Sequence, residues 1–389
     1  MDTVAVIFGG RSAEHDVSIV TAISSIIKPL ELTRRYKVEA VYISKDGAWY
    51  WGEELKHISL FSTGKITDYI RKTNPVSVQL DGGMTLIKSS GIAGRKTARK
   101  IDLVFPSMHG TYGEDGALMG LLDLAGIPYV GCGVSASAVA MNKLLSKQIV
   151  SACGMPTTKY LSLTKNELEQ NPAQAVKSVI GTLKFPLFIK PVHLGSSIGI
   201  TKAENESELR NGLEVAAHYD DTVIVEEAVT NLIEVTLPVM GNDQPVAALL
   251  EKPLTKSEDF FDFDTKYLGQ GKGGKKMSNG KRGSQGYSEV PAKLPKDLYA
   301  RAESMGLSVY KALGCSGIAR VDMLIDAKTE KIYFNEVNPL PGSLYAHNWR
   351  AAGYSNVDLV EKLIVYAKER YMQRKSLATS FNTNFLQQF

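Results

Sequence analysis

The stretch IARVDMLIDAKTEKIYFNEVN, residues 318–338, contains two apolar runs separated by the short polar segment AKTE. Each run has the length of a β-strand, and the connection is typical of a β-hairpin. Side chains two residues apart in a strand point to the same side of the sheet. A register that places Asp322 opposite Glu336 therefore gathers four polar residues on one face: Arg320, Asp322, Glu336 and Asn338.

The other face of this hairpin suits a hydrophobic core, because it carries Ala319, Val321, Met323 and Val337. A slip of one residue would bury the charged side chains, so the pattern favours this register. Oxygen-bearing side chains without His or Cys select a hard cation, Mg²⁺ or Mn²⁺, and leave coordination positions for substrate phosphates. The alternative is a solvent-exposed hairpin with an ordinary ion pair.

Length and composition set the class of protein. The chain has 389 residues, enough for two or three domains, and its net charge of +4 is too small to indicate a nucleic-acid or membrane partner. Three cysteines without CxxC spacing indicate reduced thiols, and no apolar run is long enough to cross a bilayer. We therefore expect a soluble, cytoplasmic protein.

Strands and helices alternate along the first third of the chain. VAVIFGG, KVEAVYIS, DLVFPSM and IPYVGCG have the character of buried strands, with helix-like segments such as EDGALMGLLDLAG between them. This order predicts an α/β unit with a doubly wound, mostly parallel sheet over residues 1–135. A smaller unit is predicted for 136–221, an α+β unit with an antiparallel sheet for 222–375, and a polar tail for 376–389.

A second group of residues has the character of a phosphate-binding site. In FPLFIKPVHLGSSIGI, residues 185–200, an apolar strand leads to Lys190 and then to a loop of small residues that includes Ser196 and Ser197. Such a loop can turn several backbone N–H groups toward phosphate, and Lys143 is a second candidate cation. The alternatives are an ordinary turn and a solvated lysine. There is no Walker A motif, and GCGVSA is only a weak dinucleotide fingerprint.

Together these residues resemble the D-alanine–D-alanine ligase family of the ATP-grasp superfamily, over roughly residues 4–370. The motifs that carry the resemblance are GGRSAEHDVS, HGTYGEDGALMGLLDLAGIPYVGCG, AMNK, FIKPVHLGSSIGI, FDFDTKY, GIARVDM and NEVNPLPG. The resemblance implies an ATP-grasp fold, the substrates ATP and D-alanine, two Mg²⁺ or Mn²⁺ ions, and a homodimer. It also implies an ATP-dependent ligase that makes the dipeptide for peptidoglycan precursors through an acyl phosphate.

The resemblance assigns roles to individual residues. Those matching the ATP site are Lys143, Lys190 and Ser197 for the phosphates, Glu226 and Val229 for adenine, and Glu234 for ribose. Those matching the metal ligands are Asp322, Glu336 and Asn338. Those matching the amino-acid site are Glu14, Ser196 and Tyr267 for the first D-alanine, Lys266 for the transferred phosphate, Arg320 and the Gly342 backbone for the oxyanion, and His109 for the second substrate.

Three positions depart from the family pattern. Pro339 stands where the family has Thr, Leu194 replaces a residue that is often polar, and His347 replaces a Ser that binds the acceptor carboxylate. His347 either binds the acceptor or is a packed histidine. The acceptor therefore stays open between D-alanine, another amino acid and a hydroxy acid. A nucleotide-binding module without catalysis is a further alternative. The Gly- and Lys-rich segment 268–286 is expected to be a closing loop or a solvated insertion.

Overall fold

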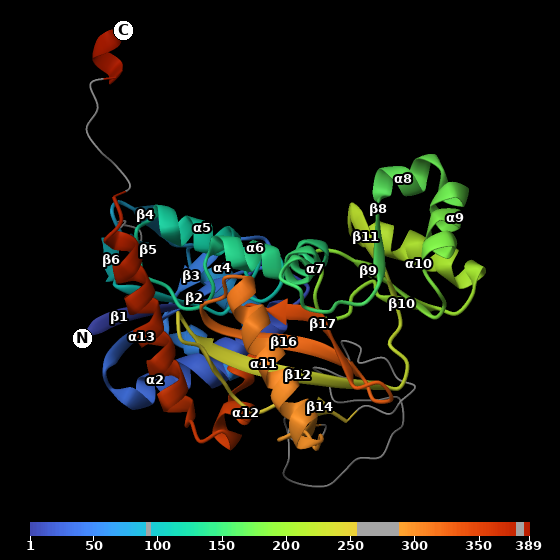
Figure 1. Cartoon of the computed structure of the whole chain (residues 1–389). Coiled ribbons are helices and arrows are strands. Elements are labelled where there is room, and N and C mark those ends of the chain that lie inside the picture. Colours follow the sequence, from blue (N-terminus) through green and yellow to red (C-terminus); the bar gives the residue numbers. More distant parts are fainter. Residues whose placement is uncertain (91–94, 255–287, 379–384) are drawn as a thin grey trace.

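The computed structural model describes residues 1–90, 95–254, 288–378 and 385–389 (Figure 1). Lys266, Tyr267 and the predicted closing loop, residues 268–286, lie outside the described residues. Within the described residues, no helix is long and apolar enough to cross a membrane.

The first unit contains a four-stranded sheet in the order β3-β2-β1-β7. The strands β1 (Asp2–Gly9), β2 (Tyr36–Ile43) and β7 (Leu103–Pro106) are parallel, and the edge strand β3 (Trp49–Trp51) is antiparallel to β2. Strand β1 is fully buried from Val4 to Phe8, as expected for a parallel strand covered on both faces. The mostly parallel sheet is confirmed. Within the described ranges, the predicted strand IPYVGCG forms only one bridge, between Tyr129 and Val104.

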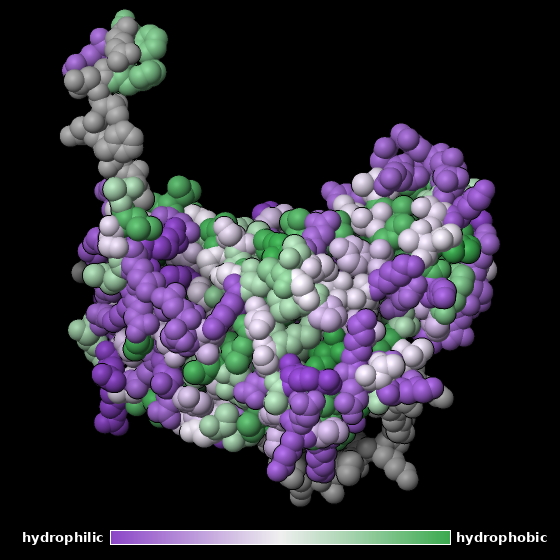
Figure 2. Space-filling model, viewed as in Figure 1, coloured by the Kyte–Doolittle hydropathy of each residue, from purple (hydrophilic) through white to green (hydrophobic). Residues whose placement is uncertain are grey.

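Helices cover this sheet, and some of them come from the end of the chain. The helical segments of the first unit are α1 (His15–Val20), the π-helical η1 (Thr21–Ile27), α2 (Lys28–Thr33), η2 (Glu53–Lys56), α3 (Ile58–Ser62), α4 (Ile66–Lys72) and α5 (Ala117–Leu124). The last long helix, α13 (Asn356–Lys375), packs on α2, and its Leu359 and Leu363 share one core with Ile26 and Leu30. Its outward face is hydrophilic (Figure 2).

A second sheet in this unit was not predicted. It contains β4 (Ser77–Leu80), β5 (Met84–Ser90) and β6 (Arg95–Ile101), all antiparallel.

The second unit has an antiparallel sheet in the order β10-β9-β11-β8. Its strands are β8 (Tyr160–Thr164), β9 (Leu187–Pro191), β10 (Thr201–Ala203) and β11 (Thr222–Glu227). Its helices are α8 (Lys165–Gln170), α9 (Pro172–Thr182) and α10 (Glu206–Tyr219), after α6 (Val134–Ala140) and α7 (Lys143–Ala152). The sequence placed residues 222–227 in the third unit, but β11 pairs with β8 and β9, so this sheet extends to Glu227.

The third unit contains the hairpin predicted for residues 318–338. Its antiparallel sheet, in the order β13-β12-β16-β17, contains β12 (Leu232–Gly241), β13 (Val246–Ala247), β16 (Gly317–Asp326) and β17 (Lys331–Asn338). Helix α11 (Lys296–Ala312) packs against β12 and β16. The remaining elements are β14 (Lys252–Pro253), β15 (Ser288–Glu289), η5 (Gly342–Tyr345), α12 (Ala346–Ala351) and η6 (Phe385–Gln388).

Candidate active site

The β16–β17 hairpin has the predicted register. Asp322 lies opposite Glu336, and Arg320 lies opposite Asn338. A β-bulge follows at once, because Met323 pairs with Phe334 and leaves Asn335 unmatched. Asn335 and Glu336 are therefore both partly exposed in a strand that otherwise alternates between buried and exposed residues. Bulges often re-aim side chains next to functional sites.

Asp322 is the centre of a polar cluster on this face. Its carboxylate accepts hydrogen bonds from Arg320 Nε and Nη2 at 2.8 and 2.6 Å, from Thr236 Oγ1 at 2.5 Å, and from Asn338 Nδ2 at 3.1 Å. Two carboxylates and an amide oxygen are the hard donors that Mg²⁺ and Mn²⁺ select, so these residues fit a divalent ion. Arg320 supplies the counter-charge of Asp322 in this arrangement.

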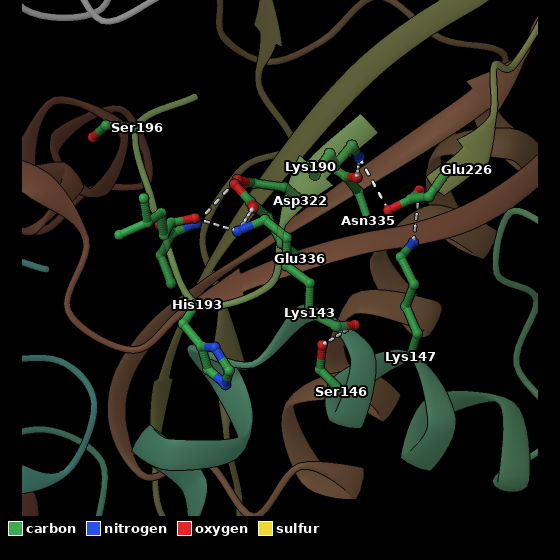
Figure 3. Close-up of polar contacts among 12 residues, drawn as sticks. Lys143, Ser146, Lys147, Lys190, His193, Ser196, Glu226, Asp322, Asn335 and Glu336 are labelled. Carbon is green, nitrogen blue, oxygen red and sulfur yellow. Dashed lines mark hydrogen bonds and ion pairs between the residues drawn. The ribbon is translucent and has the colours of Figure 1, made fainter. Parts of the chain in front are cut away.

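Two lysines reach the hairpin from the second unit (Figure 3). Lys143 is the first residue of α7, which Asn142 caps by accepting a bond from the Leu145 N–H at 2.8 Å. The Lys143 ammonium donates to the Leu194 carbonyl and lies 3.6 Å from Glu336 Oε2. The Lys190 ammonium, from β9, donates to Asn335 Oδ1 at 3.3 Å. Both predicted phosphate lysines are therefore beside the predicted metal ligands.

Glu226 is buried between these elements. Its Oε1 lies 3.2 Å from Lys190 Nζ, and its Oε2 lies 3.1 Å from Lys147 Nζ and accepts a 2.7 Å bond from Thr158 Oγ1. Burial opposes ionisation of this carboxyl, but the two lysines outweigh it and lower its pKa to about 2. Val229 follows β11, and Glu234 lies in β12; both side chains are half-buried.

The loop after Lys190 is anchored at its start by His193. The His193 N–H donates to Asp220 Oδ2 at 2.7 Å, its Nδ1 lies 3.0 Å from Asp220 Oδ1, and its Nε2 lies 3.0 Å from Asn142 Nδ2. The hydrogen bond to Asp220 raises the pKa of His193. Further along, Ser196 and Ser197 have left-handed backbones, with φ of 52° and 60°. Such a conformation is typical of loops that point N–H groups inward.

The same loop contacts the first unit. The Ser196 hydroxyl donates to Glu14 Oε1, at the start of α1. The buried His109 lies 3.2 Å from Glu114 Oε1 through Nδ1 and 3.0 Å from Thr21 Oγ1 through Nε2. Burial would lower the pKa of His109, but the hydrogen bond to Glu114 outweighs it and raises the pKa. Glu14, His109 and Glu114 bring their polar atoms within 4.8 Å of one another.

The segment after the metal ligands links these groups to the third unit. The Ser343 N–H donates to Thr21 Oγ1 at 2.9 Å, and the backbone from Ser343 to Tyr345 is left-handed, with φ of 52° to 53°. The Arg320 guanidinium lies 5.2 Å from the centre of the Tyr345 ring. Gly342, the predicted oxyanion donor, begins this segment as the first residue of η5.

His347 is a hydrogen-bonded histidine. Its Nε2 lies 2.8 Å from Oε2 of the buried Glu251, and Asn348 Nδ2 donates to the same oxygen at 3.1 Å. Burial opposes ionisation of Glu251, but the hydrogen bond to His347 outweighs it and lowers the pKa of this carboxyl. The His347 ring also lies 4.8 Å from the Tyr345 ring. His347 is therefore joined, through Tyr345, to Arg320.

Most of the predicted site residues fall into three neighbouring groups, and Ser197, Val229 and Glu234 are not among them. One contains Asp322, Glu336, Asn338, Arg320, Lys143, Lys190 and Glu226; another contains Glu14, Ser196 and His109; the third is the segment from Gly342 to His347. Sequence reasoning missed several polar residues of these groups, among them Thr21, Glu114, Lys147, Thr158, Thr236, Glu251, Asn335 and Asn348. Glu114 and Asn335 had a local signal, since they lie in the quoted motifs HGTYGEDG and NEVNPLPG.

Comparisons with known proteins identify the family of the chain. Residues 3–132 match the family described as "D-ala D-ala ligase N-terminus" and residues 149–365 match "D-ala D-ala ligase C-terminus". A D-alanine–D-alanine ligase from Acetivibrio thermocellus is 37% identical, over 95% of this chain and 96% of the relative. Another, from Enterococcus hirae, is 35% identical over 96% and 98%.

Solved structures give the same result. A D-alanine–D-alanine ligase from Coxiella burnetii matches with a TM-score of 0.77 and 26% identity, over 96% of each chain. A D-Ala:D-Ser ligase from Enterococcus faecalis matches with a TM-score of 0.75 and 33% identity, over 94% of this chain and 99% of the relative. The fold is the ATP-grasp fold. Membership of the D-alanine–D-alanine ligase family implies the use of ATP and a divalent metal ion. The chain belongs to the D-alanine–D-alanine ligase family.

Proposed function

We propose that the chain joins two molecules of D-alanine at the expense of one ATP, to make the dipeptide of peptidoglycan precursors. The observation that carries this proposal is the convergence of Lys143 and Lys190 on the hairpin that holds Asp322 and Glu336. Like charges about 4 Å apart repel by roughly 4 kcal/mol at an effective dielectric near 20. Cations from both sides are therefore needed where phosphates meet two carboxylates.

The nucleotide is held by residues of the second and third units. Lys143, Lys190 and the backbone at Ser197 bind the phosphates, and Glu234 binds the ribose. Glu226 and Val229 meet the adenine. Among the described residues, the buried Glu226 Oε1 has the Lys190 ion pair but no hydrogen bond, so it can accept one from the adenine amino group.

Asp322, Glu336 and Asn338 hold two Mg²⁺ or Mn²⁺ ions. When bound, such ions neutralise phosphate charge and favour transfer of the terminal phosphoryl group. Glu336 lies 3.6 Å from Lys143, so the same carboxylate faces both the ion site and a phosphate-binding lysine.

The reaction has two steps. Glu14, oriented by Ser196, binds the ammonium of the first D-alanine with Tyr267, and Lys266 contacts the transferred phosphate. A carboxylate oxygen of this D-alanine attacks the γ-phosphorus, the bond to ADP breaks, and an acyl phosphate forms. The amine of the second D-alanine, bound near His109 and His347, then attacks the acyl carbon. Phosphate leaves, and the amine loses a proton.

Arg320 and the Gly342 N–H stabilise the oxyanion of the tetrahedral intermediate. Loss of one such donor typically reduces the rate by about 10²–10³. Holding both substrates in position can lower the barrier by roughly 7–11 kcal/mol, so positioning carries most of the catalysis.

The test is Mg²⁺-dependent phosphate release from ATP with D-alanine as the sole amino acid, with mass detection of the product. One dipeptide for each phosphate is the expected result. Phosphate release only after addition of D-serine, D-lactate or another acceptor would agree with the proposed mechanism but not with D-alanine as the acceptor. Residues 339–349 would then be assigned the specificity for that other acceptor. ATP binding without release for any acceptor would overturn the proposed reaction.

We also propose that the protein is a cytoplasmic homodimer. Each chain is proposed to have three units, which span residues 1–135, 136–227 and 228–375. The family resemblance supports the dimer, and the use of ATP supports the location. The sheet that ends at Glu227 supports the second boundary. Sedimentation of the purified chain tests the dimer, which is expected at twice the mass of one chain.

A further inference from the structure

Lys147 is a buried lysine with no role in the reaction as described above. It lies four residues after Lys143 in α7, and its side chain is fully buried. Its ammonium lies 3.1 Å from Glu226 Oε2, and donates to Thr158 Oγ1 at 3.2 Å and to the Phe334 carbonyl at 3.3 Å. A buried ammonium is retained at high desolvation cost, so its three partners indicate a specific use.

The Glu226 carboxylate is divided between two lysines (Figure 3). Oε2 faces Lys147 and Thr158, whereas Oε1 faces Lys190 at 3.2 Å. One negative charge is thus shared by two positive charges, and the cluster keeps a net charge of +1. Without Lys147, the whole carboxylate would neutralise Lys190, and the cluster would have no net charge to offer a phosphate.

Lys147 also contacts the strand that carries the metal ligands. Its bond to the Phe334 carbonyl is made next to the β17 bulge, where Asn335 accepts from Lys190 and Glu336 lies near Lys143. One side chain therefore connects α7, β11 and the bulge of β17.

We propose that Lys147 is a positioning residue for ATP: by occupying Oε2 of Glu226 it leaves the positive charge of Lys190 only partly compensated and keeps the Lys190 ammonium oriented toward the phosphates. This inference rests on the proposed use of ATP at Lys190. It goes beyond that function because Lys147 itself contacts no substrate, and acts through Glu226 and Lys190.

A packing role for Lys147 predicts different mutant behaviour from a charge role. Lys147→Met keeps most of the side-chain volume and removes the charge. Lys147→Arg keeps the charge and increases the volume. If charge matters, the Arg variant stays within about threefold of wild type and the Met variant binds Mg–ATP about 10- to 100-fold more weakly, as is typical when a partner that orients a ligand-binding group is lost. If packing matters, the larger Arg is the more damaging change.

A double-mutant cycle with Glu226→Gln tests the route of the effect. In the Gln background Lys190 loses its ion pair with Glu226, so Lys147→Met should change the Mg–ATP affinity by less than about threefold. An equal loss in both backgrounds would overturn the inference. The same cycle should leave the KM for D-alanine unchanged. Lys159→Met is the matched control, because the Lys159 side chain is 58% exposed and pairs with Glu227 instead.

The readout is calorimetric binding of Mg–ATP to each full-length variant, with the KM for ATP measured in parallel. Urea denaturation reports whether each variant is folded. If Lys147→Met does not fold, the Arg variant and the double variant Glu226→Gln/Lys147→Met, in which one charge of each sign is removed, decide whether the charge of Lys147 matters. Binding by the wild type without turnover would overturn the proposed reaction while the cycle still tests Lys147. Unchanged binding in Lys147→Met, with turnover intact, would overturn the Lys147 inference alone. Absence of Mg–ATP binding to the wild type would overturn both.

Discussion

Asp322 and Glu336 face each other across β16 and β17, and each carboxylate has a cation beside it. Side chains directly opposite in an antiparallel pair have Cβ atoms about 4.5–5.5 Å apart, so the two carboxylates repel each other. Arg320 accompanies Asp322, and Lys143 accompanies Glu336. The pair is therefore balanced by side chains that the proposed reaction also uses.

Replacing Asp322 with Asn should lower kcat/KM at least about 100-fold, because a divalent ion contributes several kcal/mol of charge stabilisation. The Mg²⁺ concentration needed for half-maximal activity should also rise. Initial rates at a series of Mg²⁺ concentrations measure both effects.

Asp326→Asn is the control for this prediction. Asp326 ends the same strand, where it accepts bonds from the Lys328 N–H and the Thr329 hydroxyl in the hairpin turn. Its replacement should leave the Mg²⁺ dependence unchanged. Equal Mg²⁺ dependence in the two variants would contradict the metal assignment.

Glu14→Gln should raise the KM for the first D-alanine by roughly 10- to 100-fold, because a hydrogen bond to a charged group contributes about 1.5–3 kcal/mol. The Gln side chain still accepts from Ser196, so the loop contact is retained. The KM for ATP should stay constant. Steady-state rates over both substrate concentrations provide the measurement.

Asp16→Asn serves as the comparison for Glu14. The Asp16 side chain is 85% exposed and lies 4.0 Å from Lys45. This variant should behave as wild type. A rise in the KM for ATP rather than for D-alanine in Glu14→Gln would show that the carboxylate serves another part of the site.

Breaking the His347–Glu251 pair should weaken binding of the second D-alanine. In His347→Ala, the buried Glu251 keeps Asn348 but loses its bond at 2.8 Å, so we expect a loss of about 1–3 kcal/mol in stability as well. Glu251→Gln should raise the acceptor KM with a smaller loss of stability. Rates at saturating ATP, analysed for both D-alanine sites, and urea denaturation measure the two effects.

His218→Ala is the surface control, since His218 is exposed at the end of α10. An acceptor KM unchanged in both His347→Ala and Glu251→Gln would mean that the pair only packs the segment after Gly342.

The hairpin could be predicted because its information is local. Period-two alternation and a short connection determine which residues face each other, and the structure has that register. The bulge at Asn335 could not be predicted, because an apolar run followed by NEVN has the same pattern with or without an extra residue. The β4–β6 sheet was missed because β6 is rich in charged residues, RKTARKI, and lacks a buried apolar run.

Buried polar partners were missed for a different reason. Lys147 and Glu251 meet Glu226 and His347, which are distant along the chain. A lysine in a predicted helix is ordinarily expected to be solvated, so the sequence does not indicate that Lys147 is buried. Its burial is visible only in the tertiary structure. The IPYVGCG segment has the composition of a strand, but in the part of the chain that the structure describes it forms only the Tyr129–Val104 bridge. Burial and pairing depend on partners that a single sequence does not identify.

Stability should depend on pH through His193. Its hydrogen bond to Asp220 raises the pKa of the folded imidazole above 6.5, so this stabilisation is complete below pH 6.5 and is lost as the pH rises through the folded pKa. The His193 side chain is 49% exposed, so solvent screening keeps the contribution below about 1 kcal/mol. The difference in melting temperature between wild type and His193→Gln should therefore shrink from pH 6 toward pH 8. A difference that is constant over this range would contradict the ion pair.

Gly317→Ala should destabilise the chain more than Gly314→Ala does. Both glycines have left-handed backbones, with φ of 70° and 66°, which cost other residues roughly 1–2 kcal/mol. A Cβ on Gly317 would in addition lie 2.9 Å from the Gly131 nitrogen, whereas a Cβ on Gly314 would meet no atom of the described residues within 4 Å. The extra loss at Gly317 is expected to be about 1–3 kcal/mol, the usual cost of overpacking.

Urea denaturation measures this difference between the two glycine variants, provided that both have the same m-value, the slope of the unfolding free energy against urea concentration. Gly317 begins β16, the strand that carries Arg320 and Asp322, and Gly131 belongs to the first unit. A shift of this contact therefore displaces the metal-binding strand relative to the unit that carries Glu14. Gly317→Ala should accordingly lower kcat as well as stability, whereas Gly314→Ala should lower stability alone. Equal losses of stability in the two variants would show that the backbone contact relaxes without cost.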